Sequence, residues 1–218
     1  MNLTSINLGQ NATLEHPEKT EITGIFKNPV PGPVWIGKLG LEGDFIASAK
    51  HHGGPDQAVY VYGAADYAWW SHQIGRDLAP GTFGENLTVS ELECARFSIG
   101  DRLTVGAATL EVTAARIPCG TFARRMDDPQ FVQRFRDAER PGLYCRVLKE
   151  GAVQVGDVVT VEPVGGENVT LVEFYRAFYD KDLGEASLRR LLAAPLAERA
   201  RKIWEERLEK LLSEGLSQ

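Results

Sequence analysis

The stretch SIGDRLTVG at residues 98–106 returns in altered form as QVGDVVTVE at residues 154–162. Each copy begins with a Gly-Asp turn and continues as a run in which apolar and polar residues alternate. Glycine permits the tight turn, and the alternation is typical of a strand with one buried face. The two stretches therefore predict paired strands of one closed sheet, each entered through the same kind of turn.

Most of the first 163 residues have the same character, with short runs rich in β-branched and aromatic residues separated by glycine. Such runs favour strands. Beyond the two stretches above they are NLTSINL (2–8), TEITGIFK (20–27), QAVYVY (57–62), ENLTV (85–89), ATLEVTAAR (108–116) and GLYCRVL (142–148). Helical periodicity interrupts them at residues 64–75 and 128–139, and Asp128 can cap the second helix. We expect a mainly β domain over residues 1–163, a barrel or sandwich with short helices.

Residues 167–218 form a different region, because helical periodicity replaces the strand signal. Thr170 and Glu173 are spaced as a capping box at its start. Three short helices bury little alone, so they should dock on the β domain or on a partner chain. We expect a small three-helix domain and a homodimer in which Trp204 and Leu208 are buried at a two-fold interface. The expected helices span residues 170–179, 185–193 and 196–213.

The composition limits the classes of function. The 218 residues are 43% hydrophobic, enough for a real core, and the net charge of −6 argues against nucleic acid as a partner. No apolar run approaches a membrane span, and the first residues lack the order of a signal peptide, so we expect a cytoplasmic protein with no membrane partner. Three scattered cysteines predict neither a disulfide framework nor a zinc or iron–sulfur site.

The densest group of small and polar residues is KLGLEGDFIASAKHHGGPDQAVYVY, at residues 38–62. Gly53 and Gly54 would let backbone N–H groups approach an anion, and His51 and His52 could donate hydrogen bonds to it. A tight hairpin loop with solvent-facing histidines accounts for the same pattern. Zinc is the poorer interpretation, because no standard ligand spacing appears.

Two further motifs carry one candidate residue each. Asn86 in GTFGENLTV (81–89) could hydrogen-bond a planar heterocycle through its amide, or simply belong to a turn. Lys27 in TGIFKNPV (23–30) could meet a phosphate at a strand end, or merely discourage pairing at a sheet edge. Alone, each motif favours the plainer interpretation.

Cys119 has the most distinctive setting of the three cysteines, between a proline and a glycine in ARIPCGTF (115–122). Arg116, Arg124 and Arg125 are close in sequence, and nearby positive charge favours a thiolate over a thiol. A thiolate is both a nucleophile and a ligand for soft metals. Small cysteines are also common core residues, and Cys145 resembles one, while Cys94 has no special setting.

Taken in order, GIFKNPV, GLEGD, HHGGPDQAVYVY, GENLTV, IGDRLTVG, ARIPC, GLYCRVL and GDVVTV resemble the MOSC domain, named for the C-terminal region of molybdenum cofactor sulfurases. The likeness covers residues 1–163. The helical region resembles the three-helix domain of the 6-N-hydroxylaminopurine resistance branch, the YiiM-like proteins. Several spaced motifs in one order make the resemblance fairly specific. It implies a MOSC-type β-barrel that holds a molybdenum cofactor (molybdopterin), and pyridoxal phosphate binding is associated with the family at large.

The resemblance also implies roles for single residues. Cys119 matches the cysteine that supplies a sulfur to molybdenum, as metal ligand and catalytic residue. The sequence departs from some relatives directly after this cysteine, where it has GTFARRM in place of an aromatic residue and a lysine. The positions that match residues holding the pterin and its phosphate are Lys27, His52, Gly53, Gly54, Asn86 and Arg116.

The activity that the resemblance implies is the reduction of N-hydroxylated compounds, such as hydroxylamino-purines, to amines. The sequence has neither a dinucleotide fingerprint nor a cysteine cluster, so a separate reductase would have to supply the electrons. Two alternatives stay open. One is a sulfur or molybdenum-cofactor carrier that uses a persulfide on Cys119, and the other is a purely structural domain whose glycines only make turns.

Overall fold

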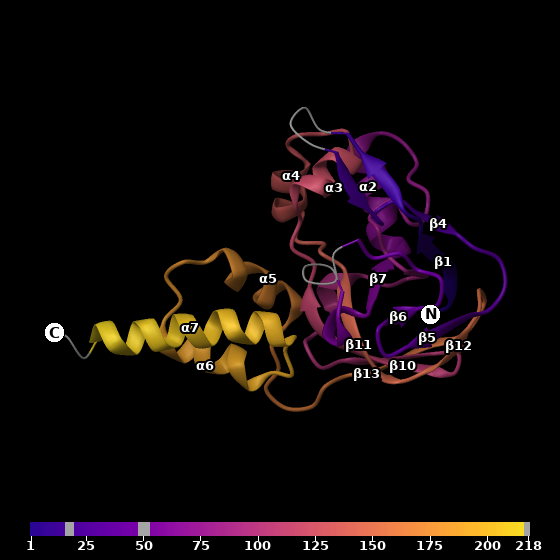
Figure 1. Cartoon of the computed structure of the whole chain (residues 1–218). Coiled ribbons are helices and arrows are strands. Elements are labelled where there is room, and N and C mark those ends of the chain that lie inside the picture. The colour runs from indigo at the N-terminus through magenta and orange to yellow at the C-terminus, as the bar shows by residue number, and fades with distance from the viewer. Residues whose placement is uncertain (16–19, 48–52, 216–218) are drawn as a thin grey trace.

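An eight-stranded sheet forms the body of the protein in a computed structural model that describes residues 1–15, 20–47 and 53–215 (Figure 1). The strand order is β13-β9-β10-β11-β7-β8-β1-β4, and neighbours are antiparallel except for β7 and β8. The strands are β1 (Leu3–Gly9), β4 (Lys27–Pro29), β7 (Val59–Gly63), β8 (Leu87–Val89), β9 (Arg102–Val105), β10 (Ala108–Ala115), β11 (Leu143–Lys149) and β13 (Val159–Glu162). The prediction of paired strands from the repeated stretches is confirmed, because β9 and β13 are neighbours with Val105 opposite Val159.

The sheet is open, and this corrects the expectation of a closed β-barrel. Its ladders end at β13 and β4. One isolated bridge joins Asn2 to Val158, and Leu3 exchanges backbone hydrogen bonds with residues 156–157. The same edge of β1 pairs with β4 at residues 7–9. Too little of that edge therefore remains for a full ladder with β13.

Two smaller sheets flank the body. The order β12-β5-β6 joins β12 (Gly151–Val153), β5 (Val34–Gly37) and β6 (Gly40–Leu41), and a hairpin joins β2 (Ala12–Leu14) to β3 (Glu21–Thr23). The expected strand at 20–27 is split into β3 and β4 around Gly24. A Cβ atom at this glycine would lie on the carbonyl oxygen of Phe45, so only glycine permits the close approach of the two segments.

Three helices gather at one end of the sheet, at the top of Figure 1: α2 (Ala64–Ile74), α3 (Gly120–Arg125) and α4 (Phe131–Ala138). Single turns of 3₁₀ helix, η1 (Pro55–Gln57) and η2 (Cys94–Arg96), precede β7 and β9. The expected helix at 64–75 is confirmed. The one at 128–139 begins only at Phe131, because Asp128 accepts the amide of Gln130 in a preceding turn (2.9 Å). The short α3 was not expected, since six residues show no periodicity.

An aromatic core holds these helices together. The ring of Phe122 on α3 lies 5.0 Å from that of Phe135 and 5.2 Å from that of Phe131, both on α4. Trp70 on α2 lies 5.1 Å from Phe131. Since α3 begins directly after Cys119, this packing fixes the segment that carries the cysteine.

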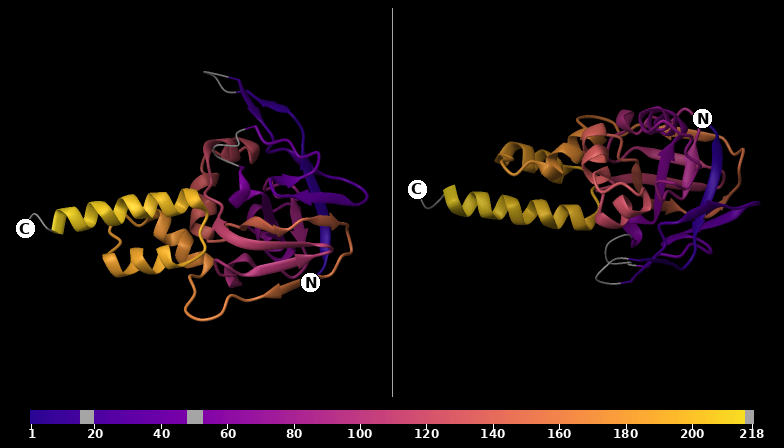
Figure 2. Two further views of the ribbon diagram at one scale, coloured as in Figure 1. Left: turned by 60° about the horizontal axis from the view of Figure 1, so that its bottom comes forward. Right: turned by 90° about the horizontal axis from the view of Figure 1, so that it is seen from above.

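The C-terminal helices are α5 (Leu171–Tyr179), α6 (Glu185–Ala193) and α7 (Glu198–Gly215), close to the expected spans. Thr170 caps α5 by accepting the amide of Glu173 (3.1 Å). Figure 2 shows all three helices on one side of the sheet, with the end of α7 extending away from it. No helix within the described ranges is both long and apolar enough to cross a membrane.

Trp204 does not lie at an interface, which corrects the expectation for this residue. It is buried within the chain, with its ring 5.0 Å from that of Phe174 on α5. Leu208 packs only partly against the core, and Leu211 and Leu212 remain exposed. The homodimer stays a prediction, and Leu211 and Leu212 are exposed apolar side chains that α7 could offer to it.

Candidate functional site

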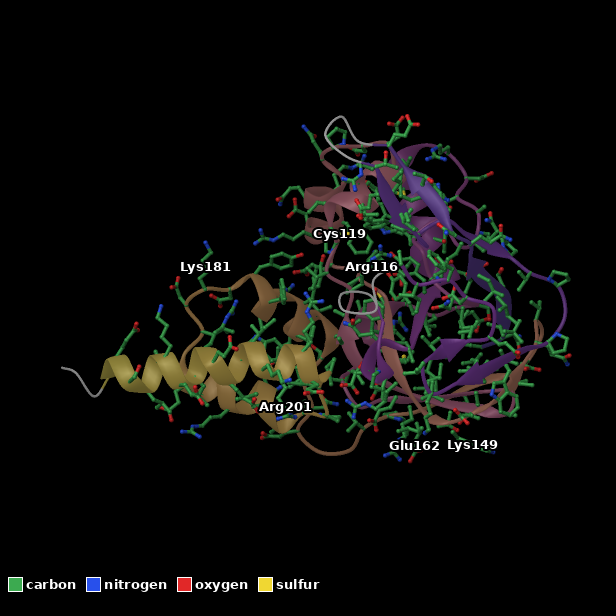
Figure 3. All side chains as sticks on the ribbon, in the orientation of Figure 1. Arg116, Cys119, Lys149, Glu162, Lys181 and Arg201 are labelled. Atoms are coloured by element: carbon green, nitrogen blue, oxygen red, sulfur yellow. The ribbon has the colours of Figure 1, made fainter. Side chains whose placement is uncertain are left out.

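A polar cavity of about 100 Å³ opens beside the start of β4. It brings together four residues from three separate segments that the sequence analysis had singled out: Lys27, Asn86, Arg116 and Cys119. Figure 3 shows Arg116 and Cys119 on the side of the sheet that faces the C-terminal helices. We call this the first cavity.

A buried ion pair forms one wall of the first cavity. The Nζ atom of Lys27 lies 2.5 Å from both carboxylate oxygens of Asp44, whose side chain is only 3% exposed. The same carboxylate accepts the side-chain amide of Asn86 (2.8 Å) and the backbone amide of Gly9 (2.7 Å). Burial lowers the pKa of Lys27, although Asp44 opposes this effect. Asp44 therefore neutralises Lys27 and also orients Asn86.

Arg116 supplies a second positive charge to the first cavity. Its guanidinium is buried, lies 4.1 Å from the ring centre of Phe122, and donates to the backbone oxygen of Phe83. Its Nε has no hydrogen-bond partner among the described residues. Burial lowers the pKa of Arg116, but interactions with acidic neighbours, Tyr60 and Cys119 among them, raise it overall. The group thus stays charged with donor capacity left over, which suits an anionic ligand.

Glu85, next in sequence to Asn86, is a fully buried acid. Its Oε1 accepts hydrogen bonds from the hydroxyls of Tyr67 and Thr88 (2.8 Å each) and from the amide of Gly81 (2.6 Å). Its Oε2 finds no partner in the described part of the chain. Burial raises the pKa of Glu85, and the hydrogen bonds counteract this rise.

A second cavity, of about 260 Å³, lies between the sheet and the C-terminal helices. Phe174 and Phe178 of α5 line it, together with Arg199 and Ile203 from the first turns of α7. The opposite wall is the end of β10 and the segment that continues to Cys119. The helical region therefore shapes this cavity, although sequence reasoning assigned it no part of the site.

Cys119 lies where the two cavities meet, because it lines both together with Gln57 and Tyr144. Its thiol is half-buried, whereas Cys94 and Cys145 are fully buried in the core. Burial raises the pKa of both core thiols, so they stay protonated. Of the three cysteines, Cys119 is thus the one whose sulfur faces space for a ligand.

The other predicted residues belong to the glycine-rich loop. His52 lies outside the described residues. Gly53 and Gly54 precede η1, and Gly54 has a φ of 91°, which side chains rarely adopt. Neither glycine lines the described walls of the first cavity. Their proposed contact with a cofactor stays a prediction.

Sequence reasoning assigned no role to three residues of the site: Asp44, Gln57 and Tyr144. Asp44 follows Gly43 inside the glycine-rich cluster, and this acid within a glycine-rich stretch was the available signal. Gln57 and Tyr144 give no local signal, because their position depends on the packing of η1 and β11. Burial raises the pKa of Tyr144, which therefore keeps its proton at neutral pH. The described residues contain no group of three or more His, Cys, Asp or Glu side chains placed to hold a metal ion.

Residues 48–160 match the family model described as the MOSC domain. The chain belongs to the MOSC domain family. Among its relatives, the uncharacterized protein YflK of Bacillus subtilis is 34% identical over 209 residues, which cover 95% of each chain. Protein YiiM of Escherichia coli is 27% identical over 203 residues, 84% of this chain and 90% of that protein. The resemblance to YiiM-like MOSC proteins is thereby confirmed.

Solved structures of MOSC-type relatives show the same arrangement over nearly the whole chain. YiiM from Geobacillus stearothermophilus superimposes with a TM-score of 0.78 at 25% identity, over 95% of this chain and 98% of that one. For YiiM from Escherichia coli the TM-score is 0.75 at 23% identity, over 96% and 94% of the two chains, and this likeness concerns the fold alone.

A third relative differs in size. A protein of Gibberella moniliformis named "Reductase" is 34% identical over 146 residues, which are 65% of this chain but only 26% of that protein. The segment that matches this chain is thus about a quarter of a larger protein that is named a reductase.

Proposed function

We propose that this MOSC protein binds a molybdenum cofactor and reduces N-hydroxylated compounds, such as hydroxylamino-purines, to the corresponding amines. The observation that carries the proposal is the position of Cys119. Its thiol lies at the boundary between a polar cavity with a buried guanidinium and a larger cavity walled by aromatic and aliphatic side chains. A soft metal ligand with an anion site on one side and an apolar site on the other suits a metal–pterin cofactor and a planar substrate.

The first cavity fits the cofactor. Arg116 has a buried Nε without a partner in the described residues, as expected of a guanidinium that serves an anionic ligand such as the pterin phosphate. Lys27 and Asn86, held by Asp44, would contribute further donors. Cys119 offers a single soft thiolate, so the remaining sulfur ligands of the metal would come from the cofactor itself. When bound, the cofactor would supply the two-electron redox chemistry of molybdenum.

The second cavity fits a planar substrate. Phe174 and Phe178 can contact the faces of a heterocyclic ring, and Ile203 adds apolar surface. The overall reaction takes up two electrons and two protons per N–O bond, breaks that bond, and releases an amine and water. At the boundary, Tyr144 keeps its proton because burial raises its pKa, so it can donate a hydrogen bond. The electrons would come from a separate reductase, because the sequence has neither a dinucleotide fingerprint nor a cysteine cluster.

The fungal relative supports the class of reaction. A segment 34% identical to this chain belongs to a protein named a reductase, of which it forms 26%. This pairing is what we expect of a catalytic domain that depends on an electron-donating partner.

The test uses protein from a host that makes molybdenum cofactor. We expect close to one molybdenum and one pterin per chain, and turnover of 6-N-hydroxylaminopurine to adenine with an artificial reductant. Cys119→Ser should abolish turnover and lower the molybdenum content, because a largely protonated hydroxyl replaces a soft thiolate. The protein should stay folded, since the loop keeps its proline and glycine.

Cys145→Ser is the matched control, since Cys145 is a core thiol outside both cavities. It should retain metal and activity in every molecule that folds. Turnover by Cys119→Ser at the normal rate would contradict the proposal. Wild-type protein that carries cofactor but reduces no N-hydroxylated compound would favour the carrier alternative, and a persulfide on Cys119, found by mass spectrometry, would establish it.

A further inference from the structure

Gln57 stands out among the three residues that line both cavities. Cys119 is assigned to the metal, and Tyr144 offers one hydroxyl. The primary amide of Gln57 both donates and accepts hydrogen bonds. Its backbone amide is used in η1, where it donates to Gly54 (3.1 Å), but its side chain has no hydrogen-bond partner in the described parts of the chain. A residue with a primary amide therefore lines both cavities together with Cys119.

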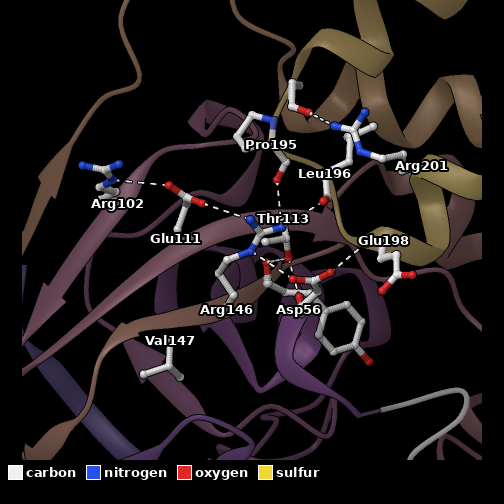
Figure 4. A network of polar contacts seen from close by, with 12 residues as sticks. Asp56, Arg102, Glu111, Thr113, Arg146, Val147, Pro195, Leu196, Glu198 and Arg201 are labelled. Carbon is white, nitrogen blue, oxygen red and sulfur yellow. Dashed lines mark hydrogen bonds and ion pairs between the residues drawn. The ribbon is translucent and has the colours of Figure 1, made fainter.

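The residue before it, Asp56, is held by several contacts (Figure 4). Its Oδ1 lies 3.0 Å from Nε of Arg146 on β11 as an ion pair. Its Oδ2 accepts the backbone amide of Glu198 (2.7 Å), and its backbone oxygen accepts the hydroxyl of Thr113 (2.5 Å). Because η1 is a single turn, fixing Asp56 also fixes the neighbouring Gln57.

The same contacts position the opposite wall of the second cavity. Glu198 is the first residue of α7, so Asp56 caps this helix from outside and places a negative charge at its positive end. Arg146 donates to the backbone oxygens of Pro195 (3.2 Å) and Leu196 (2.9 Å), just before α7. Arg199, the second residue of α7, lines the second cavity.

We propose that Gln57 orients the substrate at the boundary between the cavities, and that Asp56 is the positioning residue that holds it there. The amide oxygen would accept a hydrogen from the hydroxylamino group, and the amide nitrogen would donate to a ring nitrogen beside it. Gln57 thereby selects compounds whose N–OH group lies next to an acceptor nitrogen in a planar ring. This inference rests on the proposed function, because it names the group that recognises the same substrate.

The first experiment measures binding to the cofactor-loaded protein without reductant, by calorimetry. The probes are 6-N-hydroxylaminopurine and purine, which lacks the hydroxylamino group. We expect Gln57→Leu to weaken binding of the hydroxylated probe by about thirtyfold, because two hydrogen bonds are lost, and binding of purine by only about fivefold, because it loses the bond to the ring nitrogen alone. Gln73→Leu, at an exposed position of α2, is the matched control. Equal loss of both probes, or no loss, would overturn the role of Gln57.

The second experiment separates positioning from stability. Asp56→Asn should weaken binding of the hydroxylated probe by at least about twofold when Gln57 is present, and have no such effect in the Gln57→Leu background. A purely structural role of Asp56 would weaken binding equally in both backgrounds. Glu185→Gln, which removes the first-turn acid of α6 far from the network, is the control. Thermal unfolding of each variant verifies that it is folded.

The two proposals can fail separately. If the protein binds the hydroxylated probe in a Gln57-dependent way but shows no turnover, the proposed role of Gln57 stands and the proposed reductase activity is wrong. If the Gln57→Leu variant has a normal turnover rate and an unchanged KM, the proposed reductase activity stands and the proposed role of Gln57 is wrong.

Discussion

The first cavity has charged and amide groups beside apolar side chains such as Ile25 and Phe45, whereas the second is lined mainly by aromatic and aliphatic side chains from α5, α7 and the end of β10. The first belongs to the sheet and to segments that the sheet holds. The second exists only because the C-terminal helices pack against the sheet. Under the proposed function, the sheet would recognise the charged cofactor and the helical region the less polar substrate. A residue of either wall should therefore affect one ligand much more than the other.

The largest effect should come from Asp44→Ala, which leaves the buried charge of Lys27 without its partner. Breaking a buried ion pair costs about 3–5 kcal/mol in the free energy of unfolding. Urea unfolding followed by fluorescence would measure this loss. Adding Lys27→Met should recover most of it, since no buried charge then remains unpaired. Glu42→Ala, at an exposed position two residues away, should change stability little. An Asp44→Ala protein as stable as wild type would contradict the buried pair.

Next in size is Arg116→Met, which keeps much of the side-chain volume but removes the charge. Hydrogen bonds to charged groups contribute about 1.5–3 kcal/mol, so cofactor binding should weaken by roughly ten- to a hundredfold. The pterin released per chain gives the measurement. Binding of 6-N-hydroxylaminopurine to the cofactor-free protein should stay unchanged. Arg189→Met, at an exposed cation paired with Glu185 on α6, is the control. If Arg116→Met weakened both ligands equally, the division of roles would be wrong.

A third prediction concerns the buried acid beside the first cavity. Glu85 has a raised pKa, so on raising the pH above the ordinary value of 4.5 the unfolded chain loses its proton first. The wild type then loses stability as the pH rises, by up to about 1.4 kcal/mol per pH unit until the folded-state pKa is reached. Glu85→Gln keeps the acceptor oxygen and cannot titrate, so its unfolding free energy should show no such fall. Parallel pH profiles of the two proteins would contradict the assignment.

The smallest effect should come from Phe178→Ala in the second cavity. Losing one aromatic contact with a planar ring costs about 0.5–1.5 kcal/mol, so binding of 6-N-hydroxylaminopurine should weaken by roughly two- to tenfold. Cofactor content should not change, because Phe178 does not line the first cavity. Val172→Ala, on α5 but outside both cavities, is the control for effects on the helix itself. Loss of cofactor in Phe178→Ala would show that the helices also support the first cavity.

Most strands and all three C-terminal helices could be predicted from the sequence, because periodicity is a local property. The repeated Gly-Asp stretches gave β9 and β13, and Thr170 marked the start of α5. The strands that were missed, β2, β5, β6 and β12, have two to four residues each and lie outside the longer β-branched runs that predicted the equally short β3 and β8. The prediction of a closed barrel was wrong because closure is a non-local property. It depends on how much of one edge of β1 pairs with β4 and how much remains for β13.

The candidate site shows the same limit. Motif order pointed to Lys27, Asn86, Arg116 and Cys119, and the structure places them around one cavity. The partner that neutralises Lys27 could not be predicted, because Asp44 is 17 residues away and reaches it only through the folded sheet. The second cavity could not be predicted either. Its walls come from β10, α5 and α7, whose contact is a consequence of tertiary packing.

One edge of β1 pairs partly with β4 and partly with residues near β13, and this has a consequence for synthesis of the protein. β1 can pair with β8 once about the first 90 residues have emerged, but Met1 and Leu3 find their other partners only at residues 156–159. At the usual pace of translation this interval lasts on the order of several seconds. During that time an unpaired strand edge is available for pairing with another nascent chain. The N-terminal strand is therefore where we expect a chaperone to act and where premature aggregation should begin.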